Sequence, residues 1–135
     1  MARKNYDIDS LFRALADRTR LRLINLLGDS EVCVCFLTEI LKTSQPKISR
    51  HLAYLRRAQI VTARREGKWM HYRLIEPPDE HAARIFREVR GSLAEHPDFQ
   101  REREKLEQVC CAPTLPVQLR GAPRPSQLAT QGGGE

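Results

Sequence analysis

The sequence lacks any long apolar segment. No run approaches the roughly 18 consecutive apolar residues that span a bilayer, and the first ten residues, MARKNYDIDS, lack the apolar segment of a secretory signal. We therefore expect a protein of the cytoplasm with no membrane partner. The hydrophobic content of 41% over 135 residues fits one small domain with a single core.

The sequence also lacks the residue patterns of an active site. It contains no glycine-rich loop for phosphate and no pair of carboxylates with acid–base spacing, and its four histidines are scattered. Nothing in the chain indicates the converging acid, base and nucleophile of an enzyme. We therefore expect no enzymatic activity and no catalytic cofactor.

Cysteine is scarce, and its four residues fall into two close pairs. In a reducing cytoplasm thiols rarely form structural disulfides, so a disulfide framework is not expected. Metal binding or redox sensing accounts better for paired thiols in such a chain. The candidate metal ligands are Cys33, Cys35, Cys110 and Cys111.

Acidic residues are nearly missing from residues 42–73. This segment holds nine Lys and Arg against the single Glu66, a net charge of +8. Because the whole chain carries only +6, the remainder is net acidic. A concentrated basic segment favours a polyanion such as nucleic acid as partner, with a solvated charged face as the alternative.

Apolar residues recur at helical spacing through the first 57 residues. Asp17 is typical of a helix N-cap, Gly28 of a helix end, and Ser44 followed by Pro46 of another helix start. A helix that Asp29 or Ser30 caps is expected to carry the first two cysteines. The predicted helices cover residues 8–15, 18–27, about 30–41 and 44–57.

The spacing of apolar residues changes after Gln59. Residues 60–64 and 69–74 are expected to be strands, joined by a tight turn over 65–68 where Gly67 permits positive φ. Two more helices are predicted over 79–95 and 98–109. The organisation is a domain over residues 1–109, then a Cys-Cys segment and a disordered Pro/Gly-rich tail over 110–135.

This order of elements predicts a mainly α fold with a β-hairpin wing, a winged helix-turn-helix. In such a fold the second helix of the helix-turn-helix enters the major groove of DNA. The hairpin contacts the flanking backbone or the minor groove. Double-stranded DNA is therefore the expected partner.

Four stretches carry a resemblance to a known family. They are LADRTRLRLINLL (15–27), EVCVCFL (31–37), SQPKISRHLAYLRRAQIV (44–61) and REGKWMHYRL (65–74). Together they resemble the arsenic-repressor (ArsR/SmtB) family of metal-responsive transcriptional repressors. The resemblance implies a homodimer with the first and the late helices at its interface, bound to palindromic operator DNA.

If residues 44–57 form the recognition helix, its polar residues and those of the hairpin are the DNA contacts. Gln and Arg can bind adenine and guanine edges with two hydrogen bonds, whereas Ser and Lys more often contact phosphates. His51 is equally suited to helix packing. The candidates are Ser44, Gln45, Lys47, Ser49, Arg50, His51, Arg64, Arg65 and Lys68.

The resemblance implies trivalent arsenic or antimony as the inducer, bound by three thiolates. In a regular helix, Cys33 and Cys35 would point about 200° apart, so binding one ion would have to unwind the helix and release DNA. The family pattern places Asp where this chain has Phe36, and some members have a third cysteine where it has Thr38. Cys110 or Cys111 would then donate the third sulfur, or form a separate site.

Two alternatives keep the same fold but change the inducer. A cadmium, lead or zinc sensor is one; family members that bind zinc, nickel or cobalt have an Asp-x-His pattern that Asp79 and His81 resemble, but Ser92 replaces a later ligand. A repressor that senses oxidants or persulfides through its thiols is the other.

Overall fold

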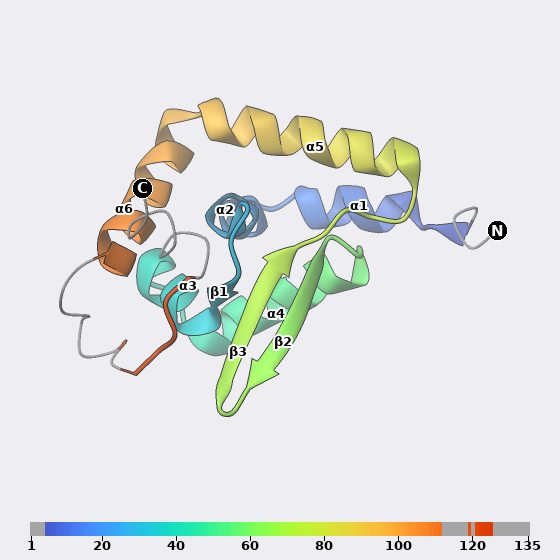
Figure 1. Ribbon diagram of the computed structural model, residues 1–135. Helices are drawn as coiled ribbons and strands as arrows, with labels where there is room; N and C mark the ends of the chain where they lie inside the picture. Colours follow the sequence, from blue (N-terminus) through green and yellow to red (C-terminus); the bar gives the residue numbers. More distant parts are fainter. Residues whose placement is uncertain (1–4, 112–118, 120, 126–135) are drawn as a thin grey trace.

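The computed structural model describes residues 5–111, 119 and 121–125 (Figure 1). The predicted mainly α fold with a hairpin wing is confirmed, and the arrangement is a winged helix-turn-helix. The elements are α1 (Ile8–Leu15), α2 (Arg18–Leu27), β1 (Val32–Cys33), α3 (Val34–Leu41), α4 (Gln45–Arg57), β2 (Val61–Glu66), β3 (Trp69–Leu74), α5 (Glu80–Glu95) and α6 (Pro97–Cys111).

Local capping chemistry sets the ends of α2. The Asp17 carboxylate accepts a hydrogen bond from the backbone N–H of Arg20 at 3.0 Å, as an N-cap does. Gly28 ends the helix with a φ of 48°, and a Cβ there would overlap the guanidinium of Arg103. Both predicted ends of this helix are therefore confirmed.

The core lies between α2 and the helix-turn-helix formed by α3 and α4. Phe36 and Leu37 from α3 are fully buried, as is Leu23 from α2. The inner face of α4 is formed by Ile48, Leu52 and Leu55, all fully buried. Each such side chain contributes about 1.5–3 kcal/mol by burial, so α4 is held firmly against the body of the protein.

The wing is part of a three-stranded antiparallel sheet with the order β1-β3-β2. The β2–β3 hairpin turns at Gly67 and Lys68, where Gly67 has a φ of 59°. The turn is shorter than the predicted 65–68, because Arg65 and Glu66 still pair with Met70 and Trp69. The hairpin projects from the side of the molecule opposite to α1 and α5 (Figure 1).

The edge strand β1 occupies the start of the segment that was expected to be a helix over residues 30–41. Val32 pairs with Tyr72 and Cys33 pairs with His71, so this segment is extended and α3 begins only at Val34. Cys33 itself is the N-cap residue, in place of Asp29 or Ser30. Pairing with β3 satisfies the backbone of β1, and Val32 and Cys33 are completely buried.

Helix α6 is fixed along α2 by polar contacts. Arg22 forms an ion pair with Glu102, and the Asn25 amide donates to the Phe99 carbonyl at 2.8 Å.

No helix in the described part of the chain is long and apolar enough to cross a membrane. Within the segment expected to be a tail, Leu119 and Ala122 are buried; residues 112–118, 120 and 126–135 lie outside the described residues.

Candidate thiol site and DNA-binding surface

The thiols of Cys33 and Cys35 meet where β1 becomes α3. Their Sγ atoms are 2.8 Å apart. The backbone of Cys33 is extended, with φ −67° and ψ 142°, so the helical angle between positions i and i+2 does not apply. The expectation that the two thiols face opposite sides of a helix is therefore wrong, and no helix has to unwind to bring them together.

Electrostatics makes the two thiols of the pair unequal. The hydrogen bond from Cys35 is the main cause that lowers the pKa of Cys33 from 9.0 to about 7, with smaller help from the backbone N–H of Cys35 and the charge of His71. The same hydrogen bond and burial raise the pKa of Cys35. Cys33, at the N-terminus of α3, is thus the more acidic of the two thiols, which favours its sulfur as the nucleophile.

A soft ion would reach this pair from the side of Cys35. Cys33 is 0% exposed, whereas Cys35 is partly exposed. Thiolate sulfur binds soft and borderline metals and metalloids in preference to hard cations. The pair therefore offers two ligands of the right chemistry for such an ion.

A third ligand is not assembled beside this pair. Among the described residues no group of three His, Cys, Asp or Glu side chains could hold a metal ion. Cys110 is buried in the last turn of α6, and only the backbone of Cys111 is described. The Thr38 hydroxyl donates to the Cys35 carbonyl at 2.8 Å, so it supports the backbone at the site.

The exposed side of α4 carries most of the predicted base-reading residues. Gln45, Lys47 and Arg50 are exposed, as is Ser44 at the N-cap, and Ser49 is half-buried. The buried apolar side of the same helix faces the core, so these polar side chains point toward solvent. Positions with this spacing on a recognition helix can reach the major groove.

His51 is tied to α2 and is only half-buried. Its Nδ1 lies 3.2 Å from Nη1 of Arg20. A guanidinium can only donate, so this imidazole nitrogen accepts the hydrogen bond. Arg20 also donates to the carbonyls of Arg13 and Ala14, at 2.8 and 2.9 Å. The structure thus gives His51 a packing contact that joins α4 to the corner between α1 and α2.

The three wing candidates differ in their surroundings. Arg64 donates two hydrogen bonds to the Glu31 carboxylate, at 2.7 and 3.0 Å. This contact lowers the pKa of Glu31. Arg65 and Lys68 are exposed near the hairpin turn, and Lys68 Nζ lies 5.0 Å from the ring centre of Trp69. The tip therefore presents two cations, while Arg64 is engaged within the sheet.

Tyr54 is an exposed residue of α4 that the sequence-based candidates do not include. Tyr54 is 43% exposed, and its ring lies between the guanidinium groups of Arg20, at 4.3 Å, and Arg57, at 4.8 Å. Tyr54 follows Lys47 and Arg50 at helical spacing, which is the signal that could have identified it.

The segment that carries the thiol pair and helix α4 has counterparts among known proteins. The family profile described as "Bacterial regulatory protein, arsR family" matches residues 17–63. The arsenical resistance operon repressor of Escherichia coli K12 is 51% identical over 80 residues, which are 58% of this chain and 68% of that protein. The chain belongs to the ArsR family.

Further relatives of this ArsR-family chain agree. The arsenic resistance transcriptional regulator ArsR1 of Pseudomonas putida is 55% identical over 65 residues, 47% of this chain and 51% of that protein. The crystal structure of AntR, described as an antimony-specific transcriptional repressor, is 27% identical and has a TM-score of 0.54, with 70% of this chain and 80% of that chain covered. These relatives are regulators and repressors, so the chain is a DNA-binding transcriptional regulator and no enzyme.

The alternative Asp79 and His81 pattern has a structural explanation in this ArsR-family chain. The Asp79 carboxylate accepts a hydrogen bond from the N–H of Ala82 at 2.9 Å and caps α5. His81 is exposed in the first turn of that helix. An acidic N-cap is favourable without any metal, so capping accounts for this part of the motif.

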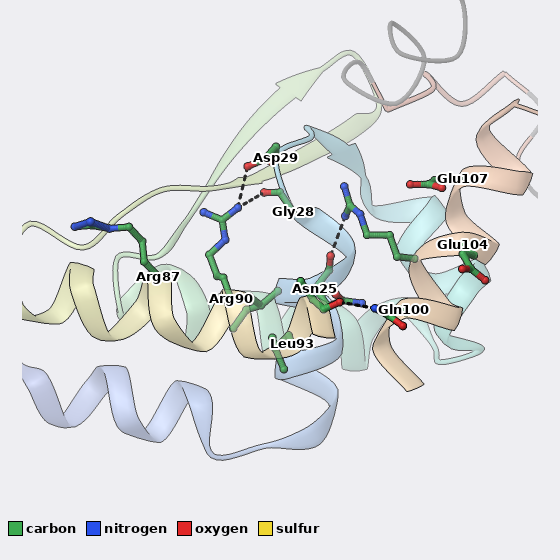
Figure 2. A pocket seen from close by; sticks show the side chains of 13 residues that line it. Asn25, Gly28, Asp29, Arg87, Arg90, Leu93, Gln100, Glu104 and Glu107 are labelled. Carbon is green, nitrogen blue, oxygen red and sulfur yellow. Dashed lines mark hydrogen bonds and ion pairs between the residues drawn. The ribbon is translucent and has the colours of Figure 1, made fainter. Parts of the chain in front are cut away.

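A cavity of about 610 Å³ lies between α2, α5 and α6 (Figure 2). Arg90 donates to the Gly28 carbonyl at 3.2 Å and to Asp29 at 2.9 Å. Arg103 donates to the carbonyls of Asn25 and Leu26, at 2.9 and 3.1 Å. These guanidinium groups satisfy carbonyls at the C-terminus of α2 and so connect α5 and α6 to it.

Proposed function

We propose that this ArsR-family regulator is a homodimeric repressor of the cytoplasm that binds operator DNA when free of inducer. Trivalent arsenic or antimony releases it by binding to Cys33 and Cys35. The observation that carries this proposal is the 2.8 Å contact between the two sulfurs at the junction of the wing sheet and the helix-turn-helix. The names of the E. coli relative and of AntR, which refer to arsenical resistance and to antimony, support the choice of inducer.

The chemistry of arsenite suits a thiolate beside a thiol. In arsenous acid, As(OH)₃, each attacking thiol forms one As–S bond, and one hydroxyl group leaves with the thiol proton as water. Two such exchanges at Cys33 and Cys35 leave one hydroxyl on arsenic. A third sulfur can replace it, and Cys110 or Cys111, of the same chain or of its partner, are the candidates.

Release of DNA would follow from where the two sulfurs are anchored. Cys33 is held in the sheet by pairing with His71, and Cys35 lies in the first turn of α3. Bonds from both sulfurs to one arsenic atom change the direction in which α3 continues from the sheet. Because α3 packs against α4 in the core, this change reaches α4. A hundredfold loss of DNA affinity needs about 2.8 kcal/mol of coupling, which two As–S bonds can supply.

The expected DNA-binding surface is formed by α4 and the hairpin tip. We assign base and phosphate contacts to Ser44, Gln45, Lys47, Ser49 and Arg50, and wing contacts to Arg65 and Lys68; the exposed Tyr54 extends the same surface. His51 and Arg64 would join these contacts only by giving up their hydrogen bonds to Arg20 and Glu31. Because many of these contacts are with phosphates, DNA affinity should fall steeply as salt increases.

Apolar residues on α1 support the proposed dimer. Phe12 is 52% exposed and Ile8 is 36% exposed, and α1 lies beside α5 along one side of the molecule (Figure 1). A second copy that covers these side chains would place two recognition helices on the same face of DNA.

The thiol geometry also favours a second candidate function, redox sensing. A thiolate in contact with a thiol is the arrangement that a peroxide oxidises to a disulfide. In that step the two sulfurs form a bond and lose two electrons and two protons to hydrogen peroxide, which leaves as two waters. A persulfide donor would act on the same pair.

The test measures binding to a labelled duplex from the DNA upstream of the gene. The wild-type protein and Cys33→Ser are titrated with arsenite, antimonite, cadmium, zinc and a persulfide donor, at several salt concentrations. We expect arsenite and antimonite to release the wild type and to leave Cys33→Ser bound. A normal arsenite response of Cys33→Ser would refute this site, and affinity independent of salt would refute the DNA-binding surface.

A further inference from the structure

Cys33 lies in register with the wing across all three strands. It pairs with His71 of β3, and His71 pairs with Arg64 of β2. Directly paired residues of an antiparallel sheet point to the same face. The inducer site, a histidine and a wing cation therefore form one row across the sheet.

His71 is a buried polar residue that the DNA-binding and inducer-binding surfaces leave unused. It is 4% exposed, and its Nε2 lies 2.8 Å from Oε1 of Glu66, the last residue of β2. It lies directly opposite Cys33 in the strand pairing, and its electrostatic effect lowers the pKa of that thiol. A buried imidazole thus connects the thiolate to the end of the wing.

A second set of contacts connects the cysteine segment to the wing through Glu31. Glu31, two residues before Cys33, accepts two hydrogen bonds from Arg64. Arg64 also lies 3.9 Å from the Glu66 carboxylate. These contacts connect the segment before Cys33 to both strands of the hairpin. We call the four residues that make them the wing relay: Glu31, Arg64, Glu66 and His71.

We infer that the wing relay transmits the state of the Cys33–Cys35 pair to the wing, with His71 as its positioning residue. The inference rests on the proposed function, because it needs an inducer at these thiols. Movement of Cys33 shifts His71 in β3 and Glu31 before β1 together. The contacts of both residues therefore act on the hairpin, which carries Arg65 and Lys68. Inducer binding then disturbs the wing contacts as well as α4.

The chain contains its own reporter for this movement. Trp69 is the only tryptophan in the sequence. It lies in β3, two residues from His71, and is therefore on the same face of the sheet. Its fluorescence reports on the wing, while the ultraviolet absorbance of the As–S bonds reports on inducer binding.

The experiment titrates arsenite into the full-length protein and follows both signals. The test variant is Glu31→Gln with Glu66→Gln, because Glu31 is half-buried and Glu66 exposed, whereas His71 is buried and its replacement could unfold the sheet. The control is Glu39→Gln on α3. Glu39 is as exposed as Glu31, at 19% against 20%, and is likewise paired with a cation, Lys42.

In the wild type and in Glu39→Gln we expect both signals to change together. In the double variant we expect the absorbance to rise as before, the Trp69 response to fall several-fold, and arsenite to weaken DNA binding by a smaller factor than in the wild type. An unchanged Trp69 response in the double variant, as direct quenching by arsenic would give, overturns the inference. Absorbance without any Trp69 response in the wild type also overturns it but leaves the proposed function intact. Absence of the absorbance refutes the proposed function, and the inference with it.

Discussion

The two cysteine pairs of this chain differ in the backbone that carries them. Cys33 and Cys35 stand on either side of the point where an extended strand becomes a helix, and their sulfurs meet at 2.8 Å. Cys110 and Cys111 are consecutive residues in the last turn of the continuous helix α6, where neighbouring positions differ by about 100°. The backbone conformation between two cysteines, more than their spacing, decides whether both can bind one ion.

Removal of a thiol from the first pair should have the largest effect. In Cys33→Ser we expect the arsenite concentration that releases half of the DNA to rise by at least about 100-fold, because a direct ligand is lost. DNA affinity without arsenite should stay close to that of the wild type. DNA-binding titrations of both proteins, with and without arsenite, measure the arsenite midpoint and the DNA affinity. Equal arsenite midpoints for the wild type and Cys33→Ser would show that the first cysteine pair does not bind the inducer.

The pH dependence of the first pair gives the next effect. The pKa of Cys33 is lowered from 9.0 to about 7, so its thiolate is present above that pH and declines as the pH falls. Below the pKa, the thiolate fraction drops about tenfold per unit of pH. The difference in ultraviolet thiolate absorbance between wild type and Cys33→Ser should therefore have its midpoint near pH 7. A midpoint near the ordinary value would show that Cys35 does not donate to Cys33.

A change in the second pair should have a smaller effect. Cys110 is 1% exposed in the core and belongs to no three-ligand cluster among the described residues. In Cys110→Ala we expect the arsenite midpoint to rise by no more than about tenfold. The same titration applied to Cys111→Ala distinguishes the two sulfurs. A loss as large as that of Cys33→Ser would identify the third thiolate in α6.

The smallest effect concerns the backbone at the second pair. Arg124 donates to the carbonyl of Cys110 at the end of α6. In Arg124→Ala we expect the free energy of unfolding to fall by at most about 1 kcal/mol, with no change in arsenite response. Arg84→Ala, which removes an exposed pair with Glu80 on α5, is the control in urea unfolding. A changed arsenite midpoint in Arg124→Ala would connect this contact to the inducer site.

Local chemistry explains which parts of the fold were predictable. Asp17 and Gly28 set the ends of α2 by local interactions. Pro46 in the first turn favours the start of α4, where Ser44 occupies the N-cap position without a side-chain capping hydrogen bond. The wing hairpin follows from the alternation around Gly67 in the same way. These elements could therefore be read from the sequence, together with the exposed face of α4.

The geometry of the Cys33–Cys35 pair depends on partners that are distant in the sequence. Val32 and Cys33 also fit a helix pattern, and only their pairing with Tyr72 and His71 makes them a strand. Glu31 likewise has a distant partner, because it accepts hydrogen bonds from Arg64 of β2. Sequence spacing identified Cys33 and Cys35 as candidates but predicted the wrong geometry for them, because Cys33 lies in a paired strand and not in a helix.

One measurement tests the central claim, that the thiols at the strand–helix junction control DNA binding. The affinity of the wild-type protein for its labelled upstream duplex is determined with and without saturating arsenite, alongside the As–S absorbance. We predict that the absorbance appears and that DNA affinity falls by a factor of about 5 to 150. Full As–S absorbance with unchanged DNA affinity would contradict the account.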